Sequence, residues 1–194
     1  MSASASPSRP SAGFQHRRLS SPRSVRLLTL LPSPSLTAAL ELLLTEVSLD
    51  RVSEQGKNGF EALSYVWGSP VGTVPVSCDG QQLLVTPNCD SALRHLRLPD
   101  HDRVLWVDAI CIDQGRSAES VRERNTQVAL MGEIYQKAAR TLCWLGPGND
   151  FTTELMAHLG RIGSCPSQRV LNKLLLFDCT CRQAITLDAT GNAE

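Results

Sequence analysis

The feature that most constrains the fold is a strand–helix–strand pattern over residues 103–146. It begins with an apolar run at residues 104–112, which a single carboxylate, Asp108, interrupts. A helical pattern follows at residues 117–139, and a second apolar run occupies residues 141–145. Apolar runs without alternation are typical of strands that are covered on both faces, as in a parallel sheet. The pattern therefore predicts a βαβ unit with a right-handed crossover.

Each apolar run of this unit carries a tryptophan, Trp106 in the first and Trp144 in the second. Because both residues lie inside apolar runs, we expect them to be buried in neighbouring strands. Truncation of either side chain should then destabilise the fold, as it does for other buried aromatic residues.

One charged side chain departs from the amphipathic pattern of the predicted helix. At about 100° per residue, the apolar side chains gather around Met131, and Arg124 projects into the same stripe. A guanidinium on a buried face is costly unless it is paired. We expect Arg124 to pair with Asp108 in the preceding strand, with Asp113 at the end of that strand as the second candidate.

Further strands and helices are indicated outside this unit. Apolar runs predict strands at residues 25–31, 40–49 and 60–67. The second of these runs could also form a helix. A short helical pattern ends near Arg97, and another covers residues 152–159.

A hairpin is the clearest short-range signal. Asp79 and Gly80 lie between two apolar runs at residues 74–78 and 81–85, which favours a two-residue turn between antiparallel strands. Together with the βαβ unit, this predicts an α/β fold with a mostly parallel central sheet, flanking helices and an antiparallel β-hairpin.

The two ends of the chain differ from its middle. Residues 1–23 are rich in Ser, Pro and Arg and predict a disordered tail. A mitochondrial transit peptide is the alternative, which the prolines disfavour because they interrupt an amphipathic helix. Residues 24–161 form the predicted domain. Residues 162–194 show no clear period and predict an irregular C-terminal segment, either a truncated domain end or foreign sequence.

Composition narrows the function classes. The chain has 19 basic and 19 acidic residues, so net charge does not point to nucleic acid. Seven cysteines without regular spacing favour a reducing, cytoplasmic compartment. No apolar stretch reaches the length of about 18 residues that a membrane span needs.

Metal binding and cysteine catalysis are not indicated. Cys179 and Cys181 are too closely spaced for the usual zinc pair, and no matching pair stands nearby. Cys111 lies in an apolar run, where a thiol is normally inert. No glycine motif of the common nucleotide-binding types is present.

What remains is a set of polar and aromatic residues in and around the βαβ unit. The set consists of Glu61, Tyr65, Trp67, Trp106, Asp108, Asp113, Gln114, Glu123, Arg124 and Gln127. One interpretation is a ligand pocket at the carboxyl end of a parallel sheet. The other is a structural cluster built on a buried Asp–Arg pair, and spacing alone favours this second interpretation.

The same residues carry a resemblance to the fungal heterokaryon incompatibility (HET) domain. The matching motifs, in order, are 62–68, Asn88 with Ala92 and Leu93, 106–114, Glu123-Arg124, Gln127-Val128, Met131, Ile134-Tyr135 and 144–146. Two departures affect the loop after residue 112. The chain has Asp113 where the family usually has asparagine, and the acidic residue before Glu123-Arg124 is absent.

The resemblance implies a role in fungal nonself recognition that leads to programmed cell death, through protein partners or self-association. The family is also considered a distant relative of the TIR domain, which implies a TIR-like or flavodoxin-like core. Some TIR domains cleave NAD with a catalytic glutamate. By that analogy Glu123 would be catalytic, Tyr65 or Trp67 would stack on a ring, and NAD would be a substrate rather than a cofactor. An inactive, truncated remnant is the third alternative.

Overall fold

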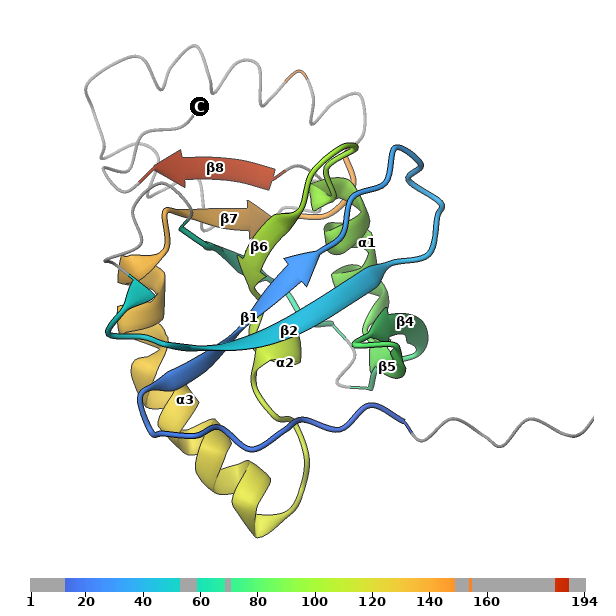
Figure 1. Cartoon of the computed structure of the whole chain (residues 1–194). Helices are drawn as coiled ribbons and strands as arrows, with labels where there is room; N and C mark the ends of the chain where they lie inside the picture. The colour runs from blue at the N-terminus through green and yellow to red at the C-terminus, as the bar shows by residue number, and fades with distance from the viewer. Residues whose placement is uncertain (1–12, 53–58, 69–70, 149–153, 155–183, 189–194) are drawn as a thin grey trace, which may run out of the picture.

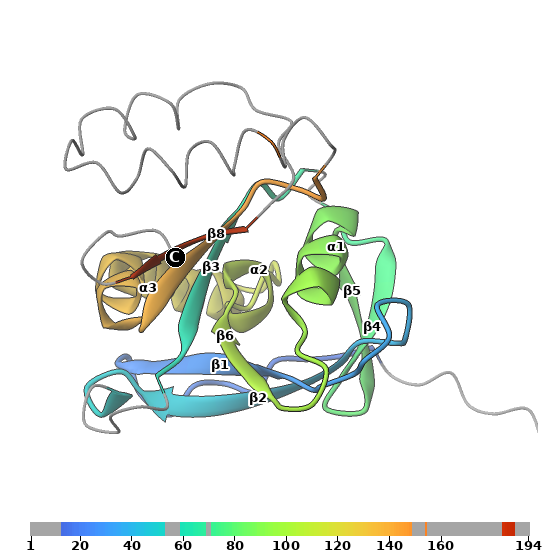
Figure 2. The same cartoon turned by 90° about the horizontal axis from the view of Figure 1, so that it is seen from above.

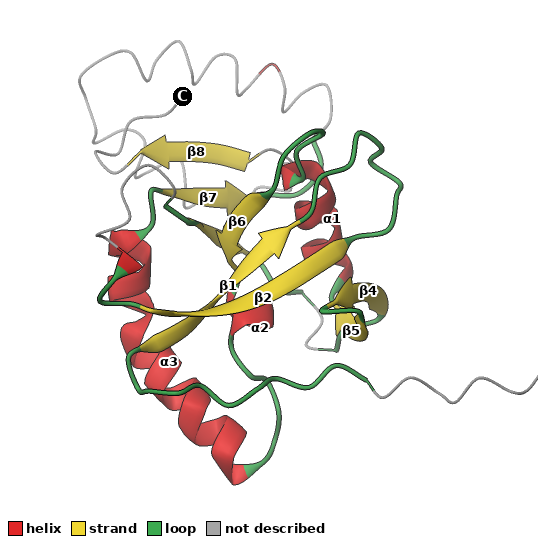
Figure 3. Ribbon diagram, in the orientation of Figure 1, coloured by secondary structure: helices red, strands yellow, loops and turns green. Residues whose placement is uncertain are grey.

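The computed structural model describes residues 13–52, 59–68, 71–148, 154 and 184–188. Within these residues the strands are β1 (Ser24–Leu30), β2 (Glu41–Ser48), β3 (Glu61–Tyr65), β4 (Val74–Cys78), β5 (Gln81–Val85), β6 (Arg103–Trp106), β7 (Arg140–Trp144) and β8 (Ala184–Asp188). The helices are α1 (Pro87–Leu96), α2 (Asp108–Cys111) and α3 (Ala118–Lys137). Figures 1 and 3 show how these elements are arranged.

The described strands form one sheet in the order β5-β4-β2-β1-β6-β3-β7-β8. The parallel pairs are β2–β4, β3–β6 and β3–β7. The antiparallel pairs are β1–β2, β1–β6, β4–β5 and β7–β8. The α/β class is confirmed, but the prediction of a mostly parallel sheet is wrong. Among the described strands, only β3 has parallel neighbours on both sides.

The reason for the mixed sheet lies in β1 and β2. These two strands pair as antiparallel neighbours from Ser24 with Ser48 to Leu30 with Leu42, and residues 31–40 connect them. β1 then pairs antiparallel with β6. A buried apolar strand such as β1 shows no orientation in its own sequence, because burial on both faces fits either direction of pairing.

The strand predicted over residues 104–112 is wrong in its second half. β6 ends at Trp106, and Asp108 to Cys111 form the short helix α2, with the Cys111 N–H donating to the Val107 carbonyl at 2.7 Å. Ile110 and Cys111 are fully buried in this helix. A short apolar run predicts burial but does not by itself distinguish a strand from a buried helix.

Trp106 and Trp144 are both buried, at 0% and 3% exposure. Their strands are not neighbours, however, because β3 lies between β6 and β7. The crossover through α3 therefore skips one strand. Figure 2 shows α3 on one side of β3 and β7, and α1 on the other.

The hairpin prediction is confirmed. β4 and β5 pair antiparallel around Asp79 and Gly80, whose φ angles are 50° and 73°. Two successive positive φ angles belong to the turn type whose twist matches a two-residue hairpin. The strands predicted at residues 25–31, 40–49 and 60–67 correspond to β1, β2 and β3.

The chain ends differ in how far the structure describes them. Residues 13–23, which belong to the predicted N-terminal tail, lead into β1, with the Phe14 N–H donating to the Gln82 carbonyl at 2.9 Å and His16 contacting α2. The helix predicted over residues 152–159 lies outside the described residues except for residue 154, as does most of the segment 162–194. Among the described residues, no helix is both long and apolar enough to cross a membrane.

Candidate functional site

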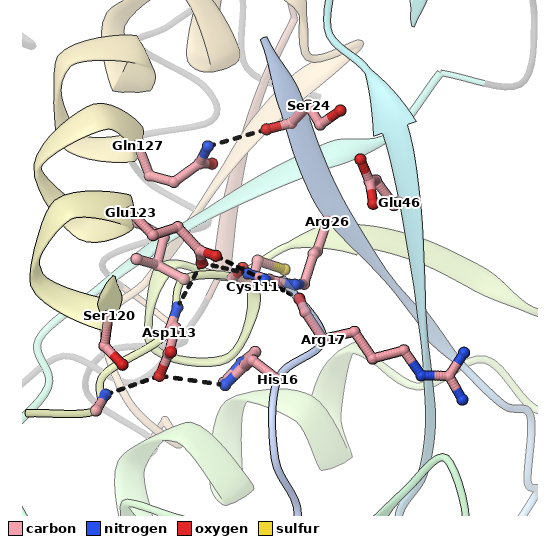
Figure 4. Close-up of polar contacts among 12 residues, drawn as sticks. His16, Arg17, Ser24, Arg26, Glu46, Cys111, Asp113, Ser120, Glu123 and Gln127 are labelled. Atoms are coloured by element: carbon pink, nitrogen blue, oxygen red, sulfur yellow. Dashed lines mark hydrogen bonds and ion pairs between the residues drawn. The ribbon is translucent and has the colours of Figure 1, made fainter. Parts of the chain in front are cut away.

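The site is centred on an ion pair between β1 and α3. Arg26 Nη1 lies 2.6 Å from Glu123 Oε1, and Arg26 Nη2 lies 2.9 Å from Glu123 Oε2 (Figure 4). Arg26 also donates to the Cys111 carbonyl at 3.0 Å and to the Arg17 carbonyl. Its side chain is 5% exposed, and that of Glu123 is 15% exposed. Such a bidentate pair fixes the angle at which α3 packs on β1.

The loop between α2 and α3 is built around Asp113. Its Oδ1 accepts from the Gly115 N–H at 2.8 Å and lies 3.6 Å from His16 Nδ1. Burial alone would raise the pKa of Asp113, but hydrogen bonds from Gly115 and Ser120, with the nearby charges, hold it below its usual value. The Asp113 N–H in turn donates to Glu123 at 3.3 Å. The loop and the ion pair therefore form one network.

Two glutamine side chains tie this network to the backbone. Gln114 donates to the carbonyls of Asp108 and Ile112, both at 3.2 Å, and so closes the end of α2. Gln127 is 1% exposed and donates to the Ser24 carbonyl at 2.9 Å. On the buried face of α3, the Gln127 amide N–H therefore has a partner, whereas its Oε1 has no hydrogen-bond partner among the described residues.

The predicted pairing of Arg124 with Asp108 is wrong. Arg124 is half-buried and donates to the Gly115 carbonyl at 3.3 Å. The predicted stripe of α3 is also displaced, since Val128 is 53% exposed while Gln127 is buried. The cause is the ion pair, because Glu123 and Gln127 face β1 and turn Val128 outward.

Asp108 instead contacts Trp67, whose Nε1–H donates to both carboxylate oxygens at 3.0 Å. Burial raises the pKa of Asp108, and the hydrogen bonds from Ala109 and Trp67 oppose that rise only in part. Tyr65 lies near this pair at the end of β3. Its hydroxyl is buried next to the Cys89 thiol, and burial raises the pKa of both groups, that of Cys89 to about 12.

The structure thus divides the predicted site residues into two groups. Asp113, Glu123, Arg124 and Gln127 surround the first half of α3, whereas Tyr65, Trp67 and Asp108 lie at the carboxyl ends of β3 and β6. Gln114 connects the groups through the Asp108 carbonyl. These residues therefore form two clusters that meet at the Asp108 carbonyl.

A groove of about 1230 Å³ lies beside the first group. The residues that line it come from two segments, 14–22 and 113–127, together with Leu83. They include Asp113, Gln114, Glu123 and Gln127 from the predicted set. No group of three or more metal-ligating side chains occurs among the described residues.

Two central residues, Arg26 and His16, were not predicted. Arg26 lies in the apolar run of β1, and a charged residue inside such a run is a usable signal for a buried pair. His16 lies in a segment whose composition predicts disorder, and nothing in its neighbourhood indicates that it contacts α2. Cys111 was predicted to be inert, and burial raises the pKa of its thiol to about 12, which keeps it protonated at neutral pH.

Comparison with known proteins gives one family and one relative. The family model described as heterokaryon incompatibility protein (HET) matches residues 60–175, more than half of the chain. Heterokaryon incompatibility protein 6, OR allele, of Neurospora crassa is 36% identical over 126 residues. The match covers 58% of this chain and 17% of that relative. No solved structure gave a significant match.

Proposed function

The chain belongs to the heterokaryon incompatibility (HET) family, and from this premise we propose that it is an effector domain in fungal nonself recognition whose activation leads to programmed cell death. The observation that carries the proposal is the family match over residues 60–175, together with the relative that is itself named as an incompatibility protein. Because this chain spans only 17% of that relative's length, the effector role is proposed for the domain itself.

We propose that the domain acts through protein partners or self-association. The geometry of Glu123 supports this mode, because both carboxylate oxygens accept hydrogen bonds from Arg26. A glutamate that stabilises positive charge on a ribose needs an oxygen that faces the substrate. Free thiols at Cys78, Cys89, Cys111 and Cys143 support action in a reducing compartment such as the cytoplasm.

NAD cleavage is the second candidate, and one observation favours it. Glu123 lines the groove of about 1230 Å³, so a ligand there could reach its carboxylate if the ion pair with Arg26 opened. This route requires the Arg26–Glu123 ion pair to open.

The test is induced expression of the whole chain in a filamentous fungus. Dye uptake would measure cell death, and enzymatic cycling would measure NAD content. We expect death without an earlier fall in NAD. Survival of cells at verified expression would overturn the effector role.

Two variants separate catalysis from structure. Glu123→Gln and Arg26→Met both break the ion pair, but only the first removes the carboxylate. If NAD falls in the wild type and in Arg26→Met but not in Glu123→Gln, the enzyme interpretation holds. Glu119→Gln is the matched control, since Glu119 is an exposed carboxylate in the first turn of the same helix.

A further inference from the structure

A surface segment of residues 14–22, here called the strap, crosses the molecule from β5 to the start of β1 (Figure 1). It makes polar contacts with four elements in turn. The Phe14 N–H donates to the Gln82 carbonyl of β5 at 2.9 Å, and His16 Nε2 lies 2.7 Å from the Ile110 carbonyl of α2. The Arg17 carbonyl accepts from Arg26 of β1, and the Ser20 N–H donates to Glu46 Oε1 of β2 at 2.8 Å. The strap therefore docks as an extended peptide on β5, α2, β1 and β2.

The strap packs on the edge of the core through Phe14, and its His16 side chain is 10% exposed. Gln15, Arg17, Arg18 and residues 20–22 are exposed, and only Phe14, His16 and Leu19 are half-buried. Phe14 and His16 pack edge to face, with ring centroids 5.0 Å apart. Because the strap lies outside the sheet and is held mainly by single hydrogen bonds and two packed rings, it should open at a lower free energy than the strands beneath it.

Hollows lie on both sides of the strap. One is the groove of about 1230 Å³ against α3, and the other has a volume of about 570 Å³ and faces β2 and the β4–β5 turn. Phe14, Gln15 and His16 line both. The two hollows thus share the strap as a common wall, and together they are called the cleft below.

The floor of this cleft keeps its geometry without the strap. Glu123 holds the Arg26 guanidinium in place with two hydrogen bonds, which leaves one Nη2 hydrogen directed at the strap (Figure 4). Ile110 lies in the last turn of α2, where carbonyls have no partner within the helix. Arg26 and the Ile110 carbonyl are therefore a preorganised donor and acceptor.

We propose that this cleft is a binding site for an extended peptide, and that the strap is its reversible, intramolecular occupant. The matching peptide carries an aromatic residue and, two positions later, an imidazole that hydrogen-bonds to the Ile110 carbonyl. The next backbone carbonyl accepts from Arg26. This site is independent of the proposed cell-death role, because it depends only on contacts within residues 14–127.

The first test weakens the strap in the full chain. In the variant with Phe14→Ala and His16→Ala, tryptic cleavage after Arg17 and Arg18, followed by mass spectrometry, should be about tenfold faster than in the wild type. Gln136→Ala is the control and should leave the rate unchanged, since Gln136 is exposed on α3 and lines neither hollow. An unchanged rate in the double variant, or its global unfolding, would overturn the proposal, because the strap would then be a fixed part of the fold.

The second test supplies the strap from outside. A fluorescein-labelled peptide of residues 13–22 should bind the double variant in an anisotropy titration, and should bind the wild type at least about tenfold more weakly because the wild-type strap competes. The same peptide with alanine at both positions should not bind. Absence of binding to the double variant would overturn the proposal. A dimeric wild type by light scattering would also overturn it, since the occupant would then come from a second copy.

Discussion

Arg26 and Glu123 join β1 to α3 through two parallel hydrogen bonds across a largely buried contact. Removing either partner alone would leave an unpaired charge in a site that water reaches poorly. We therefore expect Arg26→Met or Glu123→Gln to lower the free energy of unfolding by about 3–5 kcal/mol, measured by urea unfolding. Arg26→Lys should be intermediate, because it keeps the charge but loses the planar fork.

A double-mutant cycle provides the control for this pair. The protein with both Arg26→Met and Glu123→Gln should lose less stability than the sum of the two single variants, with a coupling of about 1–3 kcal/mol. Strictly additive losses would show that the two side chains do not stabilise each other.

This contact depends on a long-range pairing that helical spacing does not predict. Helical spacing predicts a buried charge on α3, but it points to Arg124, whereas the buried ion pair is made by the neighbouring residue Glu123. The true partner lies 97 residues earlier in the chain. A local pattern cannot predict a partner across that separation, because the pairing depends on which strand lies next to the helix.

The apolar runs predict which residues are buried, but they do not predict the direction in which each strand runs in the sheet. Most strands of the described sheet were predicted near their observed positions, because apolar runs and the Asp79-Gly80 turn are local signals. Strand direction and order are set by long-range pairing. The sequence therefore predicted that Trp106 and Trp144 are buried, but not that β3 separates them.

Asp108 should make stability depend on pH in the acid range. Its pKa is raised in the folded protein, mainly by burial, so the folded state binds its proton more tightly than the unfolded state does. The stability that this proton contributes is present below the unfolded pKa and is lost as pH rises through the folded pKa. Asp108→Asn should thus become more stable relative to the wild type as pH rises above about 4, the ordinary pKa of an aspartate in the unfolded chain. Urea unfolding at several pH values checks this, and a constant difference would contradict it.

Two glycines near α3 should respond in opposite directions to alanine. A Cβ at Gly115 would lie 2.6 Å from Ser120 Oγ and 3.0 Å from Asp113 Oδ1, so the loop would have to shift. We expect Gly115→Ala to destabilise by about 1–3 kcal/mol. Gly132 lies within α3 and has open space around it, so Gly132→Ala should stabilise by about 1 kcal/mol. Thermal and urea unfolding measure both, and a stabilising Gly115→Ala would show that the loop is not tightly packed.

Loss of the Glu61 carboxylate should cost more stability than loss of either arginine that it contacts, because Glu61 faces arginines from both neighbouring strands. On β3 it contacts Arg103 of β6, with Nη2–Oε1 at 3.0 Å, and Arg140 of β7, with Nε–Oε1 at 2.7 Å. Glu61→Gln would leave two guanidinium groups close together without the carboxylate between them, at an expected cost of about 3–5 kcal/mol. Arg140→Met should cost only about 1 kcal/mol or less, since that side chain is 42% exposed and screened by water. Arg103→Met should lie between these values, because Arg103 is 17% exposed and also donates to the Leu96 carbonyl.

Urea unfolding at low and high salt would test the order, and the Arg140 contribution should be the one that salt reduces most. Equal losses for all three variants would mean that Glu61 does not bridge the strands, and that each arginine is held mainly by its other contacts.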